Sequence, residues 1–161
     1  MAENNPRLSF LLTALDAKGM TKADLARMMG VTPQNIFTYL KRDDMKLSFA
    51  QEIFHKMGYT LSFRLEAEDA PSRDVQIDLE NLVGKDGLTR LAFLRVAMGR
   101  YGITRKDLAE KLDIGYSGVN RWFAVDDISI SYIYEIANLY GLKVKIKASV
   151  LREEKPSDLE L

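Results

Sequence analysis

The amino-acid sequence predicts a mainly α protein with a small antiparallel sheet, an α+β fold. Apolar residues recur at helical spacing along most of the chain, and Gly, Thr and Pro divide this pattern into short segments. Two segments, 59–66 and 142–150, alternate apolar and polar residues, as half-buried strands do. The arrangement occurs twice, because residues 8–65 align with residues 91–148 without a gap.

This internal repeat rests on identical residues spread along both copies. Conservative pairs such as Val31/Ile114 lie between the identical ones. Two copies are too few for a solenoid, so a tandem duplication explains the pattern best. The identical pairs include Leu8/Leu91, Gly19/Gly102, Thr21/Thr104, Asp24/Asp107, Leu25/Leu108, Ala26/Ala109, Asp43/Asp126, Asp44/Asp127 and Gly58/Gly141.

The repeat divides the chain into four parts. We expect a first unit at 7–66, an acidic linker at 67–90, a second unit at 91–150 and a disordered tail at 151–161. Within the linker, a short helix or strand around 75–83 is left open as an alternative.

Each unit begins with two helices whose ends are marked by glycine and threonine. The first helix is expected over about 7–17 and stops at Gly19, because glycine is free to adopt positive φ. Thr21 can cap the next helix, and Asp24 completes a capping-box pattern that recurs in the second unit. This second helix is expected to end near Met29.

A turn at Gly30 leads to a third helix. Thr32 supplies a capping hydroxyl, and Pro33 has no N–H to leave unsatisfied at the first helical position. The third helix is therefore expected at 32–40, and a fourth helix follows at about 47–57.

The two expected strands carry apolar residues on one face and polar residues on the other. Isolated strands do not stay unpaired, so we expect these two to pair antiparallel across a pseudo-two-fold axis. The chain is then a single-chain pseudodimer, and pairing between two chains is the alternative. The apolar faces comprise Tyr59, Leu61, Phe63 and Leu65 in the first strand, and Leu142, Val144, Ile146, Ala148 and Val150 in the second.

Composition limits the chemistry that the chain can perform. Its 161 residues are 47% apolar and include no cysteine and one histidine, His55, which we expect on a helix surface. Disulfides and thiolate metal sites are excluded, and no metal, cofactor or catalytic site is expected. Asp43–Asp44 and Asp126–Asp127 are interpreted as turns before the fourth helix, not as paired catalytic acids. No membrane helix or signal peptide is predicted, so we expect a cytoplasmic protein.

The net charge of zero hides an uneven distribution. The units at 7–66 and 91–150 each carry nine basic and six acidic side chains, whereas residues 67–90 carry three basic and six acidic ones. Two mildly basic blocks are therefore separated by an acidic segment. A surplus of this size predicts few phosphate contacts and a shallow salt dependence if the partner is a nucleic acid.

At the second and third helices the sequence resembles the helix-turn-helix of the lambda repressor and Cro superfamily (XRE-type), bacterial and phage transcriptional regulators. That motif needs a small residue midway along its first helix, a turn residue four further on, and apolar residues at fixed places. Ala26 and Gly30 fill the first two positions, and Ala109 and Asp113 fill them in the second unit. The apolar positions hold Leu25, Met29, Val31, Ile36 and Tyr39, and then Leu108, Leu112, Ile114, Val119 and Trp122.

The resemblance implies two lambda-repressor-like four-helix units that bind double-stranded DNA with helix 32–40, the first reading helix, in the major groove. Gln34 and Asn35 carry the donor and acceptor pair that matches adenine, and Phe37 can meet a thymine methyl. Thr, Lys and Arg suit phosphates. The residues expected on the phosphate backbone are Lys22, Thr32, Thr38, Lys41 and Arg42.

The second reading helix, 115–123, is less convincing. Gly118 inside it costs about 1 kcal/mol relative to alanine, and Ala124–Val125 replaces Lys41–Arg42. Whether the second unit contacts DNA is therefore left open. Its candidate contacts are Arg105, Lys106, Tyr116, Ser117, Asn120 and Arg121.

A competing interpretation is a protein-interaction module or antitoxin-like adaptor with a degenerate second helix-turn-helix. Tyr116 is its candidate apolar contact. In that case the chain binds itself or another protein. Neither interpretation predicts a membrane or a small molecule as partner.

Overall fold

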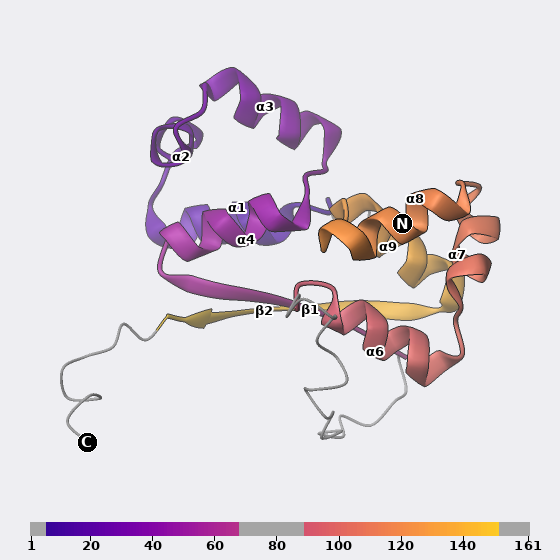
Figure 1. Cartoon of the computed structure of the whole chain (residues 1–161). Coiled ribbons are helices and arrows are strands. Elements are labelled where there is room, and N and C mark those ends of the chain that lie inside the picture. The colour runs from indigo at the N-terminus through magenta and orange to yellow at the C-terminus, as the bar shows by residue number, and fades with distance from the viewer. Residues whose placement is uncertain (1–5, 68–88, 152–161) are drawn as a thin grey trace.

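A computed structural model describes residues 6–67 and 89–151 and is mainly helical, with one two-stranded antiparallel sheet (Figure 1). We call these ranges the N-terminal and C-terminal halves. The N-terminal half contains α1 (Ser9–Lys18), α2 (Lys22–Met29), α3 (Pro33–Arg42), α4 (Leu47–Lys56) and β1 (Tyr59–Ala67). The C-terminal half contains α6 (Ala92–Tyr101), α7 (Arg105–Leu112), α8 (Tyr116–Val125), α9 (Ile130–Tyr140) and β2 (Leu142–Val150).

The ribbon formed by β1 and β2 joins the two halves. The pairing runs from Tyr59 opposite Val150 to Ala67 opposite Leu142, with Phe63 opposite Ile146 at the centre. Phe63 and Ile146 are equivalent positions in the sequence alignment of 8–65 with 91–148. The antiparallel pairing predicted for these two segments is therefore present within the chain, and its register is symmetric about the centre.

One face of the ribbon is covered by helices. Helices α4 and α6 pack against β1, and α9 packs against β2. Phe63 lies 5.6 Å from the ring of Phe10 in α1 and 6.2 Å from the ring of Phe93 in α6, so its ring touches both halves. The buried side chains of the two halves accordingly form one continuous cluster.

The far end of β2 departs from the prediction. Ala148 and Val150 were expected on the buried face, but both are exposed, and Val150 keeps 74% of its surface. The reason is an asymmetry in the helix layer. Helix α6 covers β1, but α1 makes little contact with β2, so the end of β2 lacks an equivalent cover.

Residues at both borders of the expected linker contact the two halves. Ala67 belongs to β1, and its N–H donates to the Tyr101 hydroxyl at 2.8 Å. Arg90 precedes α6 and donates through Nε to the Gln51 side chain at 2.7 Å. The segment 75–83 and the tail beyond Leu151 lie outside the described residues.

The first aspartate of each Asp-Asp pair links two helices of the same half. Asp43 and Asp126 adopt a left-handed conformation, with φ of 55°, where α3 and α8 end. The Asp43 carboxylate accepts the backbone N–H groups of Arg7 and Leu8, just before α1. Asp126, which is 5% exposed, accepts the equivalent N–H groups before α6.

The second aspartate of each pair caps a helix in the other half. Asp44 accepts the N–H of Ser131 at 2.8 Å and its hydroxyl at 2.7 Å, at the start of α9. Asp127 accepts the same two groups of Ser48 at the start of α4. The N-cap residues of α4 and α9, Lys46 and Ser129, make no side-chain cap of their own. The interpretation of these aspartates as local turns was therefore incomplete, since they also connect the halves.

Replacing Asp127 with alanine is expected to lower the free energy of unfolding by about 0.5–2 kcal/mol, the usual value of a helix cap. The equivalent change at Asp44 is expected to cost a similar amount. Urea denaturation measures both losses, with Asp16→Ala as a control for an exposed aspartate on α1. Equal losses in all three variants would show that the caps between the halves contribute nothing.

Candidate nucleic-acid interface

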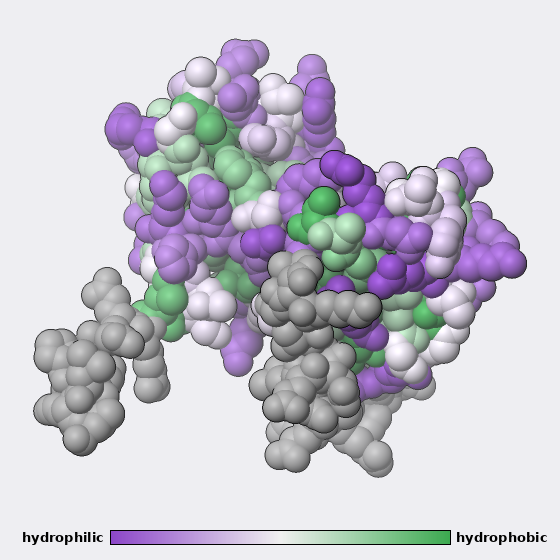
Figure 2. All heavy atoms as spheres, in the orientation of Figure 1, coloured by the Kyte–Doolittle hydropathy of each residue, from purple (hydrophilic) through white to green (hydrophobic). Residues whose placement is uncertain are grey.

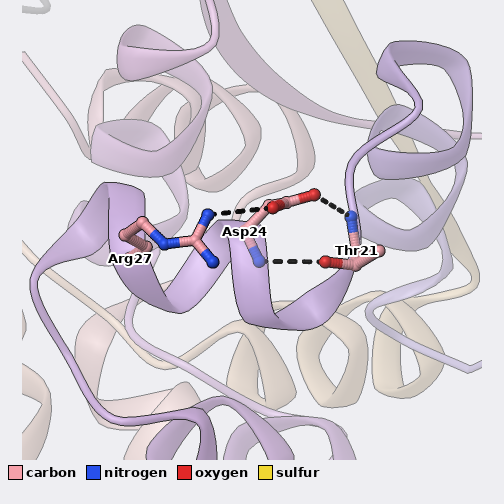
Figure 3. A network of polar contacts seen from close by, with 3 residues as sticks. All are labelled: Thr21, Asp24 and Arg27. Carbon is pink, nitrogen blue, oxygen red and sulfur yellow. Dashed lines mark hydrogen bonds and ion pairs between the residues drawn. The ribbon is translucent and has the colours of Figure 1, made fainter.

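The start of α2 is fixed by a complete capping box (Figure 3). The Thr21 hydroxyl accepts the Asp24 backbone N–H at 3.0 Å, and the Asp24 carboxylate accepts the Thr21 N–H at 2.8 Å. Arg27 adds an ion pair to Asp24 at 3.1 Å. These hydrogen bonds, with that of the Thr21 backbone first, hold the pKa of Asp24 below its ordinary value. The predicted box is therefore present.

The equivalent box at the start of α7 has the same form. Thr104 and Asp107 exchange both hydrogen bonds, and the Thr104 backbone donor is the main reason why the pKa of Asp107 is lowered. Both helices therefore start at a sharply defined residue.

The two turns of the motif follow the prediction. Gly30 and Asp113 both adopt the left-handed conformation, with φ of 67° and 55°. Asp113 shows that a non-glycine residue is tolerated here, as expected for aspartate. Ala26 and Ala109 are buried beneath these turns, where small side chains let the helices cross closely.

Helix α3, the first reading helix, presents a mainly polar outer side. Its N-cap Thr32 accepts the Asn35 backbone N–H at 3.2 Å, and Pro33 occupies the first turn. Ile36 faces the core, and Tyr39 is half-buried against Phe49 at a ring distance of 5.1 Å. Figure 2 shows hydrophilic side chains over this outer side of α3. The predicted contact residues exposed on it are Thr32, Gln34, Asn35, Phe37, Lys41 and Arg42.

Two predicted residues are engaged within this surface. Thr38 is half-buried, and its hydroxyl donates to the Gln34 carbonyl at 3.0 Å. The Lys22 ammonium lies 5.6 Å from the centre of the Phe37 ring, which is 52% exposed. The start of α2 and the outer side of α3 therefore form one continuous surface.

Helix α8, the second reading helix, is less regular at its start. Its N-cap Gly115 makes no side-chain cap, in contrast to Thr32 in α3. Trp122 is buried, as predicted, and its ring lies 5.0 Å from that of Tyr132. Of the predicted contacts, Lys106, Tyr116, Ser117 and Arg121 are exposed.

Two predicted contacts of the second unit bind each other instead of standing free. The Arg105 guanidinium donates to the Asn120 side-chain oxygen at 3.0 Å. The same guanidinium lies 4.2 Å from the centre of the buried Phe123 ring. Leu40 occupies the equivalent of Phe123 in the N-terminal half, and Lys22 the equivalent of Arg105. The buried Phe123 ring therefore holds the Arg105 guanidinium against the core of the C-terminal half.

The sequence predicted a turn at the aspartates that follow each reading helix, but it missed their bonds to the first helix of each unit. Asp43 and Asp126 stop α3 and α8 and fix α1 and α6 through two backbone hydrogen bonds each. The recurrence of both aspartates at equivalent positions was the available signal. The same aspartates at equivalent positions in both copies indicate a structural role beyond the formation of a turn.

Metal binding and membrane insertion find no support in residues 6–67 and 89–151. This part of the chain contains no group of three His, Asp or Glu side chains placed to hold a metal ion. Its helices are all too short or too polar to cross a bilayer. His55 lies exposed on α4, as predicted.

Comparisons with known proteins identify the motif in the C-terminal half. Residues 94–146 match a protein family described as Helix-turn-helix. This range contains α7 and α8, whose sequence departs further from the expected pattern than that of α2 and α3. This range is therefore similar to a helix-turn-helix domain.

One curated relative extends this result. The Repressor protein CI of Enterobacteria phage phi80 is 32% identical over 79 residues, which cover 49% of this chain and 32% of the phage protein. The chain thus spans about a third of the length of that relative. No solved structure matches the chain. The two matches support the lambda-repressor-like helix-turn-helix superfamily.

Proposed function

We propose that this protein is a cytoplasmic transcriptional regulator that binds specific double-stranded DNA sequences by placing α3 in the major groove. The observation that carries the proposal is the outer side of α3. Gln34 and Asn35 are exposed there at its first turns, which Thr32 fixes through its cap. The similarity to a phage repressor supports the same function.

The exposed residues of this surface divide into two roles. Gln34 and Asn35 are the candidates for base contacts, because an amide can donate to and accept from adenine at once. Cationic side chains at both borders of this surface are suited to contact phosphates. Such contacts position the helix on the duplex but do not distinguish between base sequences. These cations are Lys22 at the start of α2 and Lys41 and Arg42 at the end of α3.

We further propose that the chain acts as a pseudodimer that arose by tandem duplication. Its support lies in reciprocal contacts between the halves, since Leu47 N–H donates to Ile128 and Ile130 N–H donates to Met45. The caps from Asp44 and Asp127 are reciprocal in the same way. Dimeric helix-turn-helix proteins place two reading helices about 34–36 Å apart, in successive major grooves. A pseudodimer offers α3 and α8 for these two positions.

Because the two reading surfaces differ, this pseudodimer is expected to select an asymmetric site. Selection from a pool of random duplexes, followed by sequencing of the retained fraction, measures this preference. The expected result is one enriched sequence with a well-defined half-site for α3 and a different, weaker half-site for α8. Perfect palindromes alone would contradict the pseudodimer, and no enrichment at low salt would contradict DNA recognition.

One observation favours a protein partner for the second unit. On α8, Tyr116 is 55% exposed and Val125 is 51% exposed, where α3 has Pro33 and Arg42. Exposed apolar residues of this kind suit a protein contact better than a phosphate. An adaptor in which α3 binds DNA and α8 binds a protein is the second candidate. A selected site with a single half-site would favour it.

A further inference from the structure

The ribbon has a second face, turned away from the helices, that is strongly basic. We define this outer face by Arg64 in β1 and by Lys143, Lys145 and Lys147 in β2, all of them exposed. Glu66 is the single acidic residue of the two strands, and it pairs with Arg64 at 3.3 Å. Glu66 also lies opposite Lys143 in the register, so the positive surplus of this surface is carried by Lys145 and Lys147.

The register brings like charges together at the centre of this face. Arg64 lies directly opposite Lys145, and Lys147 lies opposite Ser62. Like charges directly opposite each other destabilise an antiparallel pair. An external anion bound on this face would offset that repulsion.

The outer face has the shape and chemistry of a phosphate-binding surface. Alternate residues of a strand are about 6.6–6.8 Å apart, so the β2 lysines form a straight row of evenly spaced charges. DNA presents a regular row of its own, with one phosphate on each strand for about every 3.4 Å of helix axis. Thr60 and Ser149 add hydroxyls, which commonly bond phosphates. Protein interfaces require an apolar centre, and no exposed large apolar side chain of the described residues lies on this face.

The position of the outer face separates it from the reading helices. Figure 1 shows α3 and α8 on the same side of the ribbon as α4, with α6 on the opposite side in this view. The outer-face residues alternate with the buried Leu61, Phe63 and Leu65, which α4 helps to cover, so a duplex held by α3 and α8 lies away from the outer face. We propose that the outer face binds the phosphate backbone of a second DNA duplex. One chain then bridges two duplex segments, one bound by sequence and the other by charge. This inference rests on the proposed function for the first duplex.

A bridging assay tests the inference. The duplex enriched by selection is fixed to beads and saturated with protein, and a labelled duplex of unrelated sequence is then added at about 50 mM salt. The wild-type protein is expected to capture the labelled duplex. Lys145→Gln/Lys147→Gln is expected to bind the beads equally well but to lose this capture. The control, Lys56→Gln/Arg100→Gln, removes the same charge from exposed positions outside the ribbon and is expected to keep it.

The outcomes separate this inference from the proposed function. If the wild-type protein does not bind the beads, only the proposed sequence recognition is overturned. The outer face can still be tested, because binding of the unrelated duplex can be titrated directly. In that titration, loss of both lysines is expected to reduce the salt slope by about 2. An unchanged slope, or equal capture by the variant in the bead assay, would overturn the inference. Aggregation of the variant without a change in slope would show that the lysines only prevent edge-to-edge pairing of ribbons.

Discussion

Gln34→Ala/Asn35→Ala is expected to bind the selected duplex at least about 30-fold more weakly than the wild type. Each bidentate amide contact to adenine contributes about 1–3 kcal/mol of discrimination, so two contacts correspond to about 2–6 kcal/mol. Both side chains are exposed on α3, so their loss should leave the fold intact. Fluorescence anisotropy titration at fixed salt measures the change in Kd.

A matched variant separates base contacts from general effects. His55→Ala removes an exposed polar side chain from α4, outside both reading helices, and is expected to leave the Kd unchanged. The salt slope of Gln34→Ala/Asn35→Ala should also equal that of the wild type, because neither side chain is charged. Equal affinity of this double variant and the wild type would remove α3 from the interface.

Phe63→Ala is expected to lower the free energy of unfolding by about 3–5 kcal/mol, as large-to-small changes of buried aromatic residues do. Phe63 is 3% exposed at the centre of the ribbon, and its ring lies against Phe10 of α1 and Phe93 of α6. Removing it opens the core where the halves meet. We therefore expect one cooperative transition at lower denaturant concentration, monitored by circular dichroism.

The control for this change is Thr60→Ala, an exposed position on the same strand with an expected effect within about 0.5 kcal/mol. Two separate transitions in the wild-type protein would contradict a shared core. A loss below about 1 kcal/mol for Phe63→Ala would contradict the burial at the centre of the ribbon.

Helix ends were predictable because their signals are local. Thr21 and Asp24 are three residues apart, and the box that they form needs nothing from the rest of the chain. The pairing of β1 with β2 was predictable for another reason, since each strand has one apolar face and no other partner was evident. The register also follows from symmetry, because the equivalent residues Phe63 and Ile146 meet at its centre.

The caps between the halves could not be predicted in this way. Asp44 and Ser131 are 87 residues apart, and their contact depends on how the ribbon brings α4 and α9 together. The uncovered end of β2 likewise depends on the unequal packing of α1 and α6. These features depend on tertiary packing, and the same sequence pattern is compatible with several packing arrangements of the helices.

The exposure of the candidate contacts was more predictable in the first unit than in the second. Exposure of Gln34 and Asn35 follows from helical periodicity once Ile36 is assigned to the core. The contact between Arg105 and Asn120 involves side chains on two helices, and Phe123 beneath them decides the geometry. Pattern alone shows which residues share a face, but not which of them bind each other.

We propose that one chain presents two reading helices to one duplex. The most direct measurement combines the mass of the complex with a footprint on the selected duplex. We expect one chain per duplex and two protected major-groove patches whose centres are about 10–10.5 base pairs apart. Two chains per duplex, or a single protected patch with one chain bound, would contradict it.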